Sequence, residues 1–148
     1  MQQYEVSASV HKGGLATAQA KQSAIRFDGS AQQDPVLPGP AELLAAAFAA
    51  CALKNVERFS KILPFRYESA SIRVVAEREE PPPRIVSIHY RLTIDTDEPA
   101  KRVELLHRNL RKYGTVYNTL AAGCRVNGEI VVGNTGAQAG ERTNAEQS

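Results

Sequence analysis

Residues 39–53 of the chain are GPAELLAAAFAACAL, and this apolar stretch decides the fold. Pro40 suits the first position of a helix, where its missing N–H costs little, and Glu42 places a negative charge in the first turn. Beyond Glu42 the stretch has no charged side chain, so this half of the helix has to be covered on every side. We therefore predict a buried helix that ends before Pro64 and carries one cysteine, Cys51.

Strands are predicted on both sides of this helix by alternation of apolar and polar residues. The clearest pattern lies at residues 84–96, whose inner face we expect on helices and whose outer face we expect in water. Asn127-Gly128 is a hairpin signal, but its flanks are short and favour one bulged strand. Helical spacing predicts a second helix at residues 99–113, closed by Gly114 as a left-handed cap. The other expected elements are a half-buried strand at residues 2–11, strands at 14–20, 23–28, 66–79 and 124–132, and a turn or helix at 115–122.

The composition indicates one ordinary folded domain. The chain has 148 residues, of which 43% are hydrophobic and 23% charged, a balance typical of globular proteins. Chains of roughly 100–150 residues usually form a single core. We expect this domain at residues 1–133. Residues 134–148 have no apolar side chain larger than Ala and no periodicity, which predicts a disordered tail.

Several partners and locations are excluded by the same composition. The net charge is only +2, the basic residues are scattered and there is no Trp, which argues against nucleic acid. The longest apolar run has eleven residues (43–53), whereas a membrane-spanning helix needs about 20. The N-terminus lacks the charged and apolar regions of a secretory signal. We therefore expect a cytoplasmic protein whose two cysteines are thiols.

Neither a metal site nor a cofactor is predicted. His11, His89 and His107 fall in a turn, on a strand and on a helix, and no pair has metal-ligand spacing. No glycine-rich phosphate-binding motif is present. Cys51 remains the candidate for chemistry, although a cysteine in an alanine-rich helix is often only a small buried hydrophobe.

Two motifs together resemble a known family. The first is the helix from Gly39 to Cys51, and the second is Val116-Tyr117-Asn118-Thr119-Leu120. Their sequences and separation resemble the OsmC/Ohr family, the osmotically inducible and organic hydroperoxide resistance proteins, from about Tyr4 to Val132. The resemblance implies an α+β, OsmC-like fold in which antiparallel sheets pack around a long central helix. It also implies an intertwined homodimer.

In its active members the family resemblance implies a thiol peroxidase. There the helix cysteine attacks a hydroperoxide and becomes a sulfenic acid, which condenses with a second cysteine. An external dithiol such as a lipoyl group then reduces the disulfide. Because the attacking group must be a thiolate, a nearby cation or hydrogen-bond donor has to stabilise it. Lys54 and Asn55 share one helix face with Cys51, and Lys54 either serves this purpose or faces solvent.

This sequence departs from the family pattern at three places. The second cysteine is expected two residues before Val116, and that position is Gly114. A glutamate is expected ten residues before Cys51, but the nearest is Glu42, nine residues before it and about 13 Å along the helix. Glu42 cannot touch Cys51 of its own chain, so its role would be either as a first-turn charge or as a candidate catalytic group that faces the partner subunit. An arginine is expected in the first strands, but the chain has none before Arg26, and Lys12 and Lys21 lack the planar fork of a guanidinium.

Two hypotheses follow from these residues. In the first, the protein is a redox-defence enzyme that reduces organic hydroperoxides with Cys51 as nucleophile and an external dithiol. Cys124 is then a candidate resolving thiol, although a buried strand position is the more common role for such a cysteine. In the second, the protein is a non-catalytic dimer of the same fold that binds a small apolar molecule in the cleft between subunits.

Overall fold

The computed structural model describes residues 1–134 of the chain. These residues form two compact units, one at residues 1–44 and one that begins at Ala45, and both helices and strands are present, so the predicted α+β class is confirmed. The single domain expected at residues 1–133 stays a prediction. Of the tail expected at 134–148, all but Asn134 lies outside the described residues. No helix within residues 1–134 is long and apolar enough to cross a membrane.

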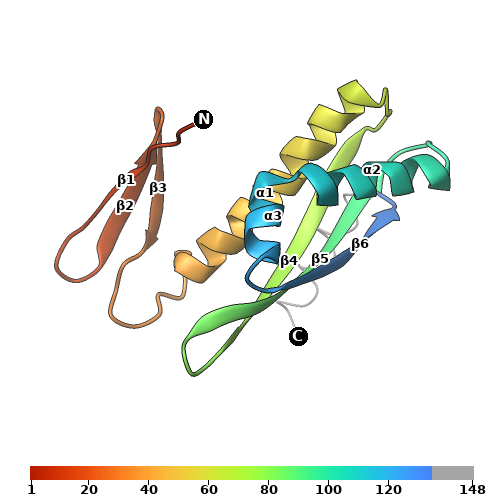
Figure 1. The fold of residues 1–148 in the computed structure, drawn as a ribbon. Coiled ribbons are helices and arrows are strands. Elements are labelled where there is room, and N and C mark those ends of the chain that lie inside the picture. The colour runs from red at the N-terminus through yellow and green to blue at the C-terminus, as the bar shows by residue number, and fades with distance from the viewer. Residues whose placement is uncertain (135–148) are drawn as a thin grey trace. The chain divides into compact units, whose positions relative to one another are not determined.

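The first unit contains an antiparallel meander of three short strands (Figure 1). Its chain reverses at Gly13 and Gly14, whose φ angles of 101° and 103° suit glycine. Every residue of the first strand is exposed, and Ala16 is the one buried residue of the three strands. Of the strand predicted at residues 2–11, residues 7–10 are confirmed as a strand, but the predicted half-burial is wrong, because so small a sheet forms no core of its own. The strands are β1 (Ser7–Val10), β2 (Leu15–Ala20) and β3 (Ser23–Asp28).

The apolar stretch forms the long helix α1 (Pro40–Ile62), as predicted. It begins at Pro40 and ends two residues before Pro64, because proline cannot continue the hydrogen-bond ladder. Phe48, Val56 and Phe59 are buried on its inner side. Part of its apolar half remains uncovered, and the exposed residues there are Ala46, Ala47 and Ala50.

The second unit contains a mixed sheet in the order β4-β5-β6. β4 (Ser69–Glu79) pairs antiparallel with β5 (Arg84–Asp95), whereas β6 (Arg125–Val132) pairs parallel with β5. Asn127 and Gly128 lie inside β6 opposite His89 and Tyr90, so this segment is one strand and not a hairpin. The parallel register is unbroken, and the bulge lies instead between Glu77 and Arg78 of β4.

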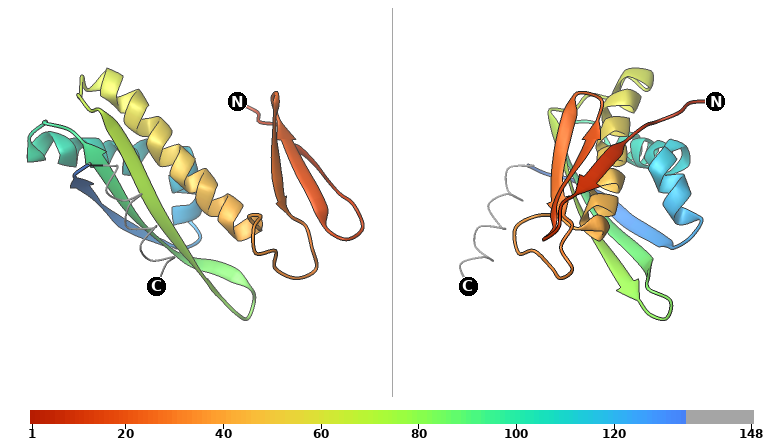
Figure 2. Two further views of the ribbon diagram at one scale, coloured as in Figure 1. Left: turned by 180° about the vertical axis from the view of Figure 1, so that it is seen from behind. Right: turned by 90° about the vertical axis from the view of Figure 1, so that its left-hand side faces the viewer.

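Helices α2 (Ala100–Tyr113) and α3 (Thr115–Ala121) complete the second unit, and Figures 1 and 2 show them with α1 beside the β4-β5-β6 sheet. Gly114 has φ −73° and is not the predicted left-handed cap. The reason is that α3 starts at once, and the Gly114 carbonyl accepts a hydrogen bond from Asn118 N–H at 2.8 Å. The core residues shared by α1, β5 and α2, with Phe65, are Val56, Phe59, Phe65, Leu92, Ile94, Val103, Leu106 and Leu110.

Candidate functional site

Cys51 is half-buried on α1 and lines a narrow pocket of about 10 Å³. That space is near the minimum for one water molecule. Apolar and aromatic side chains dominate its lining, so the sulfur is held in a poorly solvated place. The other residues around it are Phe48, Ala52, Tyr90, Leu92, His107, Leu110, Arg111 and Tyr117.

Asn55 is the hydrogen-bond donor nearest the sulfur on the same helix. It lies one turn after Cys51, and only 9% of it is exposed. Its Nδ2 donates to the Cys51 carbonyl at 3.0 Å and lies 3.6 Å from Cys51 Sγ. The amide N–H therefore points at the sulfur as well as at the carbonyl. Lys54 was expected either to stabilise a thiolate or to face solvent. It is exposed and does not line the pocket, so it faces solvent.

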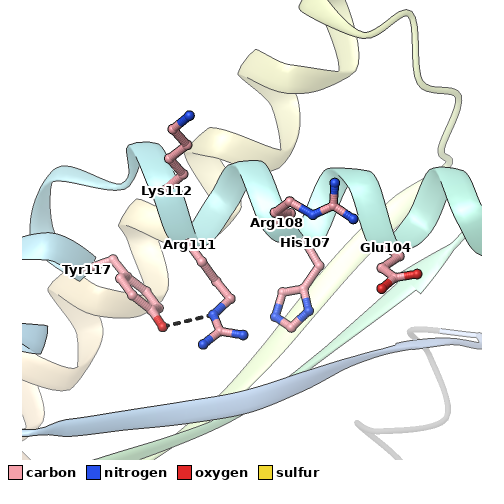
Figure 3. A pocket seen from close by; sticks show the side chains of 6 residues that line it. All are labelled: Glu104, His107, Arg108, Arg111, Lys112 and Tyr117. Carbon is pink, nitrogen blue, oxygen red and sulfur yellow. Dashed lines mark hydrogen bonds between the residues drawn. The ribbon is translucent and has the colours of Figure 1, made fainter.

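Arg111 brings a positive charge to the same pocket from α2. Its Nε donates to the Tyr117 hydroxyl at 3.2 Å, an interaction drawn in Figure 3. Sequence reasoning looked for an arginine in the opening strands and missed this residue. The available signal was the spacing of His107 and Arg111, which lie one turn apart on a single face of a helix.

His107 and Tyr90 form a second polar pair at the pocket. Tyr90 OH and His107 Nε2 are 2.6 Å apart. Burial raises the pKa of Tyr90 to about 12, whereas burial, assisted by the nearby Arg111 charge, lowers the pKa of His107. Both groups are therefore neutral at pH 7, with the phenol protonated. Sequence reasoning gave both residues only structural roles.

Gly114 lies directly against the Cys51 sulfur. A Cβ added at Gly114 would sit 3.4 Å from Cys51 Sγ, within van der Waals distance. It would also come within 2.9 Å of the Leu110 carbonyl oxygen and of Tyr117 Cβ. In the family pattern the second cysteine occupies position 114. A side chain at that position would contact Cys51 Sγ, but the residue in this chain is glycine.

The two other predicted site residues lie elsewhere. Cys124 is half-buried just before β6, where its thiol donates to the Leu120 carbonyl at 3.2 Å, and it does not line the Cys51 pocket. Glu42 is exposed in the first turn of α1. Within residues 1–134, no group of three or more His, Cys, Asp or Glu could hold a metal ion.

The sequence model of one protein family, described as OsmC-like protein, matches residues 31–129. The chain belongs to this OsmC-like family. The match includes α1 with Cys51 and the segment around Gly114, and it confirms the family predicted from the two sequence motifs. No curated protein is significantly similar to the chain.

Solved structures of OsmC-like proteins share the fold. An OsmC-like protein from Mycoplasma pneumoniae is 17% identical with a TM-score of 0.82, and the match covers 90% of this chain and 99% of that one. An organic hydroperoxide resistance protein OsmC from Legionella pneumophila is 16% identical with a TM-score of 0.68, covering 90% and 100%. The organic hydroperoxide resistance protein OhrB of Bacillus subtilis is 15% identical with a TM-score of 0.65, covering 88% and 98%.

Proposed function

We propose that the protein is a cysteine-dependent peroxidase of redox defence that reduces organic hydroperoxides with Cys51 as the nucleophile. The observation that carries the proposal is the contact between position 114 and Cys51 Sγ, because a resolving thiol at that position would meet the sulfur. The names of the Legionella and Bacillus relatives, both hydroperoxide resistance proteins, support the same chemistry.

The pocket supplies what a peroxide-reactive sulfur needs. The Asn55 amide lies 3.6 Å from Sγ and Arg111 lines the same pocket, so a hydrogen-bond donor and a positive charge are both close to the reacting groups. The apolar lining admits little water to the reacting groups. Because the pocket is so narrow, only the reacting –OOH group enters it, and the rest of the substrate stays outside.

The reaction balances with two equivalents of an external thiol. The Cys51 thiolate attacks the terminal oxygen of ROOH, the O–O bond breaks, and Cys51–SOH and an alkoxide form. Arg111 stabilises the alkoxide until it takes a proton from water and leaves as ROH. A first external thiol then condenses with Cys51–SOH to a mixed disulfide and water, and a second thiol releases Cys51 and a disulfide product.

The second thiol comes from outside the chain in this proposal, because Gly114 carries none and Cys124 does not line the pocket. A reducing compartment such as the cytoplasm supplies the thiols that this cycle consumes. This requirement makes turnover depend on the nature and concentration of the added thiol.

We also propose that the protein acts as a homodimer. Large apolar side chains of the meander stay exposed, and one side of the α1 apolar half is uncovered as well. Each of these exposed apolar surfaces, taken by itself, is typical of a protein interface. Glu42 would then act on the partner subunit, since it lies about 13 Å along the helix from Cys51. The exposed meander residues are Tyr4, Val6, Val10, Leu15 and Ile25. Sedimentation at a mass near the chain's own 16.1 kDa would contradict the dimer.

The enzyme proposal is tested with cumene hydroperoxide and hydrogen peroxide. Purified protein is treated with each oxidant in the presence of a sulfenic-acid probe, and each cysteine is examined by mass spectrometry. We expect labelling at Cys51, faster with cumene hydroperoxide, and peroxide consumption with dithiothreitol. Cys51→Ser should abolish both, and Cys124→Ser, the matched control, should retain both.

The opposite result would favour the non-catalytic alternative. If Cys51 stays unlabelled and none of several dithiols supports turnover, the enzyme proposal fails. In that case a small apolar ligand between subunits becomes the better hypothesis, since the pocket beside Cys51 is too small to hold one.

A further inference from the structure

A cleft of about 440 Å³ opens on α2 beside the Cys51 pocket. Glu104 and Arg111 each lie three or four residues from both His107 and Arg108, so the four side chains share one side of the helix. Figure 3 shows Glu104, His107 and Arg111 extending from α2 toward the sheet, with Arg108 between them. The volume is in the range of small-molecule sites.

The cleft has more positive than negative charge. Arg108 forms no ion pair with any residue in 1–134, and Arg111 donates a hydrogen bond to the neutral Tyr117 hydroxyl. Lys112 borders the cleft but turns its amine onto the Tyr113 ring, 5.2 Å from the ring centre. The acidic member of the lining is Glu104. Two guanidinium groups against one carboxylate favour an organic anion, since arginine binds carboxylates with two parallel hydrogen bonds.

The cleft and the Cys51 pocket share three lining residues, His107, Arg111 and Tyr117. A molecule in the cleft is therefore next to the opening through which a substrate reaches the sulfur. The two cavities differ in character: the inner one is apolar and very small, about 10 Å³, whereas the outer one is charged and has a volume of about 440 Å³.

We propose that this cleft binds the external reductant, a small thiol that carries carboxylate groups. This inference rests on the proposed peroxidase function. An organic hydroperoxide with an apolar body gains nothing from two guanidinium groups, whereas an acidic thiol is oriented by them with its sulfur toward Cys51. The missing side chain at Gly114 makes such a second substrate necessary.

The chemistry assigned to the cleft is the resolving step. The thiol sulfur of the bound reductant attacks Cys51–SOH, a S–S bond forms, the S–O bond breaks and water leaves. A second reductant attacks the mixed disulfide, releases the Cys51 thiolate and carries away the disulfide product. Arg108 binds the reductant and does not touch the reacting sulfur.

The first test compares mercaptosuccinate with its diamide as reductants of the wild-type protein, with cumene hydroperoxide as oxidant. We expect kcat/KM to favour the dicarboxylate, and Arg108→Gln to reduce that preference about tenfold, as for the loss of one charge-assisted hydrogen bond. Arg108→Lys should retain part of the preference. Lys101→Gln removes one charge from an exposed site on the same helix and should leave the preference unchanged.

The preference should also fall as salt is added, because screening weakens exposed charge pairs. Equal use of the acid and the diamide by wild type would overturn the proposal. So would a preference that follows the charge of the hydroperoxide, tested with a carboxylate-bearing hydroperoxide against cumene hydroperoxide, because the cleft would then serve the oxidant.

A second test separates this inference from the peroxidase function. Calorimetry measures the binding of succinate, which has no thiol, to Cys51→Ser protein with and without Arg108→Gln. If Cys51 proves unreactive but succinate binds and Arg108→Gln weakens it, the peroxidase proposal fails and the anion site stands. If peroxide turnover occurs and neither succinate binding nor a dicarboxylate preference is found, the cleft proposal fails alone.

Discussion

Cys51 and Cys124 have the same side chain and a similar degree of burial, but their surroundings differ. Cys51 lines a pocket with Asn55, Arg111 and the bare backbone of Gly114 close by. Cys124 packs against an aromatic and aliphatic cluster, and its thiol hydrogen is donated to a backbone carbonyl. Thiol reactivity follows access and nearby positive charge. The comparison therefore supports the proposal that Cys51 carries the chemistry and that Cys124 is a packing residue.

Tyr90 is common to both environments. It lines the Cys51 pocket, and it belongs to the cluster of Phe48, Ile88 and Tyr90 against which Cys124 packs. The ring is kept in place from the other side by β6, whose Gly128 lies opposite it in the sheet. A substitution that displaces the Tyr90 ring should therefore alter the surroundings of both sulfurs. A substitution at position 114 or 55 should alter the surroundings of Cys51 only.

The largest expected effect comes from Gly114→Cys. The new Cβ lies 3.4 Å from Cys51 Sγ, so oxidation by peroxide should produce a disulfide between the two residues that is absent from wild type. Crowding against Leu110 and Tyr117 should cost about 1–3 kcal/mol of unfolding free energy. Non-reducing peptide mapping detects the disulfide, and Gly114→Ser is the matched control with the same added Cβ. A disulfide between Cys124 and the new cysteine would instead show that Cys124 is the more accessible thiol.

Gly128→Ala should displace Tyr90, whose ring lies close to both cysteines. The added methyl would lie 2.4 Å from the carbonyl oxygen and from Cδ1 of Tyr90, and the backbone cannot yield easily. We expect a loss of about 3 kcal/mol in unfolding free energy, measured by urea denaturation. At Gly123 the nearest atom to an added Cβ is 4.0 Å away, so Gly123→Ala is the control. Equal stability of the two variants would contradict the close approach.

Asn55→Leu should slow the oxidation of Cys51 and leave Cys124 unaffected. The substitution keeps the side-chain size but removes the N–H that lies 3.6 Å from Sγ. We expect the rate of sulfenic-acid formation to fall about tenfold. Asn109→Leu is the control, because Asn109 Nδ2 also donates to a carbonyl one turn earlier, at 2.8 Å, without a sulfur nearby. An unchanged rate would remove Asn55 from the site.

The smallest expected effect is on the pH dependence of stability, and it comes from His107. Its pKa in the folded protein is lowered below the unfolded value of about 6.5 by burial and by Arg111. Between these two pKa values the unfolded chain binds more protons, so stability should be complete above pH 6.5 and decrease as the pH falls below it.

The slope of the unfolding free energy against pH should correspond to less than one proton taken up on unfolding, because His107 is only half-buried and solvent screens its charge. His107→Phe should flatten this dependence in thermal melts from pH 7.5 to 5, whereas His89→Gln, at an exposed position of β5, should not. A decrease that persists in His107→Phe would assign the proton to another group.

Local patterns in the sequence were sufficient for most of the elements. The apolar stretch with Pro40 and Pro64 predicted α1 almost to the residue, and alternation predicted β4 and β5. The predictions failed where a neighbour outside the local window decides the outcome. The first strand is exposed because its small sheet has no core, and Gly114 is not left-handed because α3 follows directly.

The sequence by itself determined the family, the long helix and the single cysteine that this helix presents. Those features depend on residues close together in the chain, whose periodicity and order are visible without a structure. The tertiary structure alone decided what surrounds the sulfur, since Tyr90, His107 and Arg111 come from elements far from Cys51 along the chain. Side-chain contacts between such elements depend on packing, which no local pattern records. The absence of an arginine before Arg26 was therefore visible in the sequence, whereas the place of the Arg111 side chain at the pocket was not.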